Sequence, residues 1–79
     1  MLKENELSER KIHQLCQFGL TPLQAKVYVA LLRLRHGGAG EIAREARANR
    51  AETYRVLKKL QRLGLVEVYL ARPKQFNPV

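Results

Sequence analysis

The sequence predicts a mainly α-helical domain that ends in a small β-hairpin, and three observations lead to that prediction. Apolar residues recur every three to four positions from Ser8 to Leu63, the spacing of helices that pack on a core. After Gly64 the interval becomes two, in Val66–Leu70, which indicates a strand. The chain has 79 residues, 46% of them hydrophobic, so we expect residues 1–79 to form one domain with one core.

The first two helices are expected at about residues 8–18 and 22–35. Ser8 is a suitable N-cap for the first helix, and the residues before it are expected to fray. Gly19 ends this helix, because glycine adopts a positive φ at little cost. The second helix has the stronger start signal. Thr21–Gln24 combines an N-cap, a proline at the first helical position and a glutamine at the third, which is the pattern of a capping box.

A short helix, a tight turn and a longer helix follow. We expect the short helix at about residues 40–46, the turn at Arg47–Asn49 and the longer helix at about residues 50–63, with Asn49 as its N-cap. At about 100° per residue, the core-facing stripe of the longer helix consists of Thr53, Leu57, Leu60 and Gly64.

A β-hairpin is expected at about residues 65–79, with its turn at 71–75. Phe76 points inward from the second strand, because alternate residues of a strand face the same side. The apolar positions of the first strand, which should share one face, are Val66, Val68 and Leu70.

The charge of the chain indicates a polyanionic partner. Fifteen Lys and Arg against seven Asp and Glu give a net charge of +8. Residues 1–26 hold four basic and three acidic residues, whereas residues 44–62 hold seven basic and two acidic ones. Such a local excess is typical of a surface that binds nucleic acid. The alternative is a charged, solvated helix face.

Composition excludes several other classes of protein. Cys16 is the only cysteine, which argues against a disulfide scaffold and, with two distant histidines, against a zinc site. The chain has no aspartate and no visible pairing of nucleophile and base, so we expect no enzyme and no cofactor. It also has neither a membrane span nor a signal peptide, which predicts a cytoplasmic, nucleoid-associated protein.

The order of the expected elements is that of a winged helix-turn-helix. In such a domain the longer helix, here 50–63, enters the major groove of double-stranded DNA. The turn of the hairpin, here 71–75, contacts the backbone or the minor groove. The candidate DNA contacts are Arg44, Arg47, Asn49, Arg50, Glu52, Thr53, Arg55, Lys58, Lys59, Arg62, Arg72 and Lys74.

These candidates differ in their expected roles. Arg50 and Arg55 lie early in the longer helix and are candidates for bidentate contacts with guanine, or else for phosphate contacts. Residues 58–62 lie farther along and are expected to hold the DNA backbone. Tyr54 is expected either in the core or at its edge, touching phosphate.

Several segments together resemble the N-terminal domain of the TrmB family, which consists mostly of archaeal, sugar-responsive transcription regulators. The resemblance extends from about Leu15 to Val79. It implies a DNA-binding regulator domain without the effector-binding domain that often follows the wing in this family. The segments that carry it are Gly19–Thr21, Ala25–Leu32, Glu41–Ala43, Tyr54–Leu60, Gly64–Val66 and Arg72–Phe76.

Two positions depart from the family pattern. Arg47 begins a turn that in the family is usually of a Gly-Val-Pro type, and a left-handed backbone there would cost arginine on the order of 1 kcal/mol relative to glycine. Glu52 stands where the family often has a basic residue. Its carboxylate either accepts a hydrogen bond from cytosine N4 or interacts with the helix dipole.

Three functions remain open from the sequence. The first is a sequence-specific regulator that acts as a homodimer on two half-sites. The second is an architectural protein that coats DNA with little sequence preference. The third is a winged-helix module whose basic face binds an acidic protein.

Overall fold

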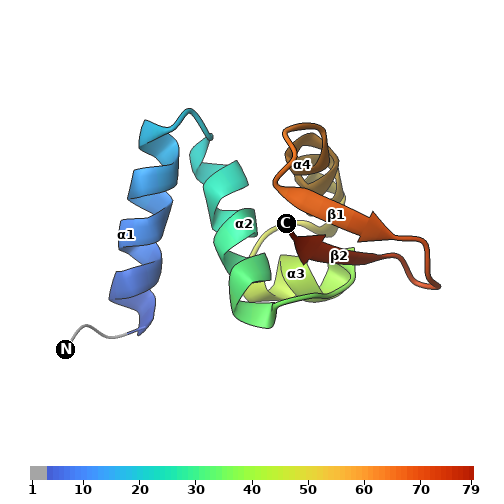
Figure 1. Cartoon of the computed structure of the whole chain (residues 1–79). Coiled ribbons are helices and arrows are strands. Elements are labelled where there is room, and N and C mark those ends of the chain that lie inside the picture. Colours follow the sequence, from blue (N-terminus) through green and yellow to red (C-terminus); the bar gives the residue numbers. More distant parts are fainter. Residues whose placement is uncertain (1–3) are drawn as a thin grey trace.

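The computed structural model describes residues 4–79 and contains four helices followed by a two-stranded hairpin (Figure 1). This architecture confirms the expected mainly α fold with a C-terminal wing. The elements are α1 (Glu4–Gln17), α2 (Pro22–Leu34), α3 (Ala39–Ala46), α4 (Arg50–Arg62), β1 (Val66–Tyr69) and β2 (Gln75–Pro78).

Helix α1 begins earlier than expected. It starts at Glu4, so the prediction that Ser8 is its N-cap was wrong, and so was the expected fraying from Glu4 onward. Residues 1–3, also expected to fray, lie outside the described residues. The Ser8 hydroxyl instead accepts a hydrogen bond of 2.8 Å from Arg33 Nη1 and so links α1 to α2. Gly19 follows the helix with a φ of +104°, the conformation expected there.

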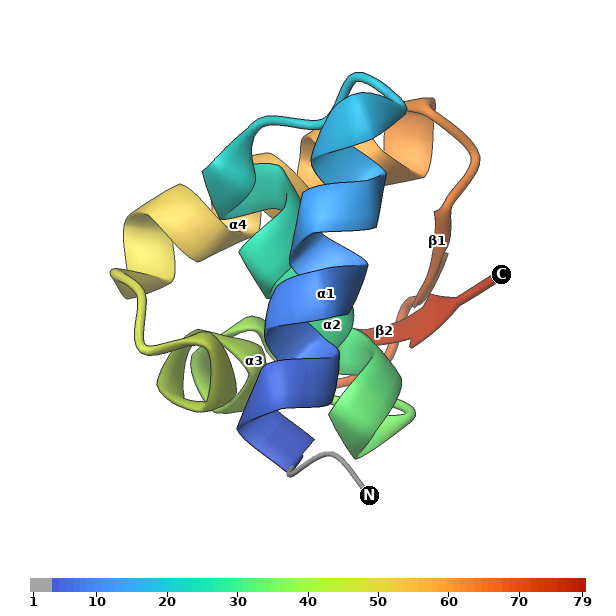
Figure 2. The same ribbon diagram turned by 90° about the vertical axis from the view of Figure 1, so that its left-hand side faces the viewer.

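Helix α2 begins with the predicted capping box and forms the centre of the core. The Gln24 N–H donates to Thr21 Oγ1 (3.1 Å), and the Thr21 N–H donates to Gln24 Oε1 (3.0 Å). The helix has α1 on one side and α3, α4 and the hairpin on the other (Figures 1 and 2). The buried core cluster comprises Val27, Ala30, Leu31, Ile42, Ala46, Val56, Leu57, Leu60, Val66 and Phe76.

The turn between α3 and α4 has a left-handed backbone at Arg47, the position where the TrmB family usually has a glycine. Arg47 has φ 55° and ψ 47°, and its N–H donates to the carbonyls that end α3. Asn49 then caps α4 as predicted, because its side-chain oxygen accepts a hydrogen bond of 3.1 Å from the Glu52 N–H.

The hairpin is antiparallel, with Val68 opposite Phe76, and a third segment joins it. Gly37, after α2, exchanges two backbone hydrogen bonds with Phe76 (3.1 and 2.8 Å), a pairing that the periodicity did not reveal. Phe76 is buried, as expected. Leu70, expected to continue the first strand, lies beyond the end of β1 with 87% of its surface exposed, so the predicted strand was one residue too long there. The strand pattern continues only to Tyr69, where the chain enters the turn.

Candidate nucleic-acid interface

Helix α4 has one face in the core and one in solvent. Thr53, Val56, Leu57 and Leu60 are buried on the inner face. Among the residues expected to bind DNA, those on the outer face are exposed. They are Arg50, Glu52, Arg55, Lys58, Lys59 and Arg62.

Thr53 was predicted both in the core stripe and as a DNA contact, and the structure supports only the first. The residue has no exposed surface. At about 100° per residue it lies on the same side of the helix as Leu57 and Leu60. Its hydroxyl has no hydrogen-bond partner among the described residues. Thr53 is therefore a core residue and does not belong to the exposed face of α4.

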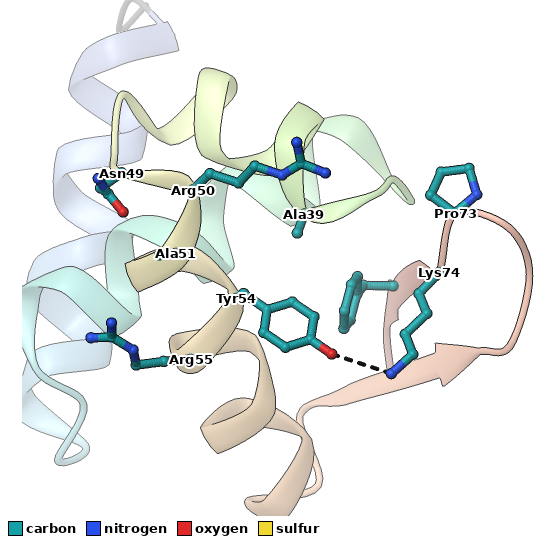
Figure 3. A pocket seen from close by; sticks show the side chains of 9 residues that line it. Ala39, Asn49, Arg50, Ala51, Tyr54, Arg55, Pro73 and Lys74 are labelled. Carbon is teal, nitrogen blue, oxygen red and sulfur yellow. Dashed lines mark hydrogen bonds between the residues drawn. The ribbon is translucent and has the colours of Figure 1, made fainter.

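A groove of about 690 Å³ separates the first turns of α4 from the wing (Figure 3). It brings together four of the predicted contacts, Asn49, Arg50, Arg55 and Lys74, and no acidic residue lines it. The other residues that line it are mostly small or aromatic, so the groove combines basic side chains with an apolar surface. The remaining lining residues are Ala39, Ala51, Tyr54, Pro73 and Phe76.

The two arginines at this groove point in different directions. Arg50 extends toward Ala39, whereas Arg55 extends away from the wing (Figure 3). A Cβ at Gly40 would lie 3.6 Å from Arg50 Nε, so the side chain of Arg50 packs on the first turn of α3. The two guanidinium groups therefore lie in different regions around the groove.

Tyr54 joins α4 to the wing. Lys74 Nζ donates a hydrogen bond of 3.2 Å to its hydroxyl, and Lys58 Nζ lies 5.2 Å from the centroid of its ring. The ring meets Phe76 edge-to-face, at 6.3 Å and 86°. The hydrogen bond from Lys74, followed by the positive charges of Lys74 and Lys58, lowers the pKa of Tyr54.

The sequence identified Tyr54 only as a core or edge residue and missed this connection. The four-residue spacing of Tyr54 and Lys58 indicated that they share a helix face. Nothing in the local pattern indicated that Lys74, 20 residues farther along, would reach the same ring.

The other predicted contacts lie outside the groove. Arg47 lines a different hollow, between α1, α2 and α3, which also contains Glu45, the ion-pair partner of Arg33 at 3.1 Å. The remaining six are exposed but do not line the α4–wing groove. They are Arg44, Glu52, Lys58, Lys59, Arg62 and Arg72.

Across residues 4–79, no helix is both long and apolar enough to cross a membrane. In that same part of the chain, no three His, Cys, Asp or Glu side chains lie together in a way that would hold a metal ion.

A short helix, a tight turn and a second helix with a basic outer face, followed by a hairpin, define a winged helix-turn-helix DNA-binding domain. Residues 15–79 match the family described as "Sugar-specific transcriptional regulator TrmB". The chain belongs to this TrmB family, which consists of transcriptional regulators and not of enzymes, and contains its helix-turn-helix DNA-binding domain.

Two archaeal relatives illustrate the similarity. The chain is 32% identical, over 73 residues, to the HTH-type sugar sensing transcriptional regulator TrmBL1 of Pyrococcus furiosus. The match covers 92% of this chain but only 21% of that relative. The solved structure of TrmBL2, described as an archaeal chromatin protein with a novel mode of DNA binding, superposes with a TM-score of 0.84 at 26% identity. That match covers 91% of this chain and 28% of TrmBL2.

Proposed function

We propose that this chain recognises specific sequences in double-stranded DNA as part of a transcription regulator. Helix α4 enters the major groove, and the wing turn at 71–75 contacts the backbone or the minor groove. The groove between α4 and the wing carries this proposal, because it gathers Asn49, Arg50, Arg55 and Lys74 around a surface without acidic residues.

The arrangement of the side chains supports a division of roles. Arg50 and Arg55 lie in the first turns of α4, where side chains reach base edges, and they diverge enough to contact different bases (Figure 3). The later basic residues of α4 are exposed and suited to phosphate contacts. These backbone contacts are assigned to Lys58, Lys59 and Arg62 on α4, to Arg72 on the wing, and to Arg44 and Arg47 before α4.

Glu52 keeps both of its proposed roles. It lies exposed in the first turn of α4, where a carboxylate interacts favourably with the helix dipole. The same position allows it to accept a hydrogen bond from cytosine N4.

An architectural role is the second candidate. TrmBL2 is described as a chromatin protein, and its similarity to this chain favours binding along DNA with less sequence preference and an association with the nucleoid. The shared fold accommodates both roles, because backbone contacts alone support non-specific binding.

We further propose that the regulator acts as a homodimer. Two copies of α4 would then read half-sites about 34–36 Å apart, one helical turn of DNA. Sugar sensing, which TrmBL1 carries in its description, would reside in parts of a regulator beyond the region matched here.

Selection of duplexes from a random pool, at low and at physiological salt, tests these proposals. An enriched palindrome supports specific recognition by a dimer, and enrichment of a single half-site supports specific recognition without dimerisation. Salt-sensitive binding without enrichment supports the architectural role. Absence of duplex binding at both salt concentrations contradicts both functions and leaves an acidic protein partner.

A further inference from the structure

A second, smaller hollow lies beside Tyr54, between α4 and the hairpin. Its volume is about 260 Å³. Four side chains that can donate hydrogen bonds line it, no acidic residue does, and its remaining walls are apolar. The donors are Tyr54, Lys58, Gln61 and Lys74.

Tyr54 is fixed between these donors. Its ring packs edge-to-face on buried Phe76 and therefore has little freedom to move. Lys58 lies 5.2 Å from the ring centroid. Lys74 is closer to the hydroxyl (3.2 Å) than to the centroid (5.8 Å), so its main contact is the hydrogen bond and not the ring face.

This arrangement gathers positive charge from two elements around one neutral side chain. Lys58 belongs to α4 and Lys74 lies in the turn of the wing, directly before β2. The tyrosine ring and hydroxyl stabilise the two cations without neutralising them. Because the hydroxyl oxygen already accepts from Lys74, its own O–H remains available to donate to a ligand. The lowered pKa of Tyr54 has the same electrostatic origin.

We propose that Tyr54 assembles Lys58 and Lys74 into one binding site for a backbone phosphate of duplex DNA. This inference rests on the proposed DNA-binding function and deepens it. A single phosphate held by both lysines ties the wing to the recognition helix and sets the position of the wing on DNA. Tyr54 is a positioning residue in this site, with a secondary contact of its own through the O–H group.

The first test measures the salt dependence of duplex binding by fluorescence anisotropy for the 79-residue chain. Loss of one phosphate contact lowers the slope of log K against log salt by about 0.9. The double variant Lys58→Ala/Lys74→Ala should lower it by about this amount and each single variant by less, because the remaining lysine still holds the shared phosphate. A double variant that loses about 1.8 would show two separate phosphates and overturn the shared site. Lys26→Ala, an exposed lysine on α2, is the matched control and should leave the slope unchanged.

The second test isolates Tyr54. Tyr54→Phe keeps the ring but removes the hydroxyl, and should weaken duplex binding by about threefold to tenfold. In a Lys74→Ala background the same change should have a smaller effect, because one partner of the hydroxyl is already absent. Equal effects in both backgrounds would mean that Tyr54 does not position Lys74. Tyr28→Phe, on α2, removes a hydroxyl elsewhere and serves as the control.

Spectroscopic titration of Tyr54 supplies a readout that a purely structural role would not change. Bound phosphate disfavours the phenolate, so duplex DNA should raise the pKa of Tyr54 from its lowered value. An unchanged pKa in the complex would contradict a phosphate beside the ring. If the wild-type chain binds no duplex, the proposed function fails. If it binds but these variants match wild type, only the phosphate site fails.

Discussion

Helix α4 has 13 residues, and its two faces differ in burial and in charge. The inner face is apolar except for Thr53 and is buried against α2 and α3. The outer face is mainly charged and makes few contacts that would fix its side chains. Stability is therefore concentrated on the inner side of the helix, and we propose that DNA binding uses the outer side. Substitutions on the two faces should separate folding from DNA binding.

The largest expected effect is that of Leu57→Ala on the inner face. Leu57 has no exposed surface, so its truncation leaves a cavity at the centre of the core. We expect the free energy of unfolding to fall by about 2–5 kcal/mol, measured by urea denaturation. Lys59→Ala, two residues away on the outer face, should change it by less than about 0.5 kcal/mol. Similar losses in the two variants would show that the faces are not energetically distinct.

The next effect concerns DNA binding by the outer face. Arg50→Ala should cost about 1–3 kcal/mol against the preferred duplex and relax the preference at one or two base pairs. Lys59→Ala should weaken binding to all duplexes equally and lower the salt slope by about 1. The measurement is affinity for the selected duplex and for its single-base variants. The division into reading and holding residues fails if the two variants lose affinity in the same pattern.

The same contrast explains what could be predicted from the sequence. The core side of α4 follows from helical geometry, so Leu57 and Leu60 were correctly placed. The caps at Thr21 and Asn49 were also predicted, because their signals are local. The start of α1 was misjudged because Ser8 was expected to cap the helix. Its hydroxyl instead accepts a hydrogen bond from Arg33, 25 residues away, and such a long-range contact leaves no local signal.

Long-range contacts also limited the prediction of the site. The groove depends on the position of the wing relative to α4, and that position is set partly by the pairing of Gly37 with Phe76. The contact between Tyr54 and Lys74 has the same origin. Periodicity describes one element at a time and therefore contains no information on either contact.

A smaller effect is expected at Thr53, the polar residue on the inner face of α4. Its buried hydroxyl has no hydrogen-bond partner among the described residues, and such a group costs free energy in a core. Thr53→Val keeps a similar shape and should raise the free energy of unfolding by about 1 kcal/mol. Its affinity for duplex DNA should equal that of wild type. Weaker DNA binding by a stably folded Thr53→Val variant would show that the Thr53 hydroxyl contributes to DNA binding.

The smallest expected effect is at Arg47, where α3 ends. Its left-handed backbone, with φ 55°, costs a non-glycine residue about 1–2 kcal/mol. Arg47→Gly removes that strain but increases the entropy of the unfolded chain, which offsets about 0.5–1 kcal/mol of the gain. We therefore expect a net increase of about 0.5 kcal/mol in the free energy of unfolding.

Arg44→Gly is the matched control, because it places glycine inside α3, where the free energy of unfolding should fall by about 1 kcal/mol. Opposite signs at these two positions would show that the strain is specific to the turn. A loss at both would mean that the arginine side chain at position 47, which lines the hollow near Glu45, contributes more than its backbone costs. In that case the departure from glycine has a structural benefit, and the turn before α4 is held by side-chain contacts as well as by its caps.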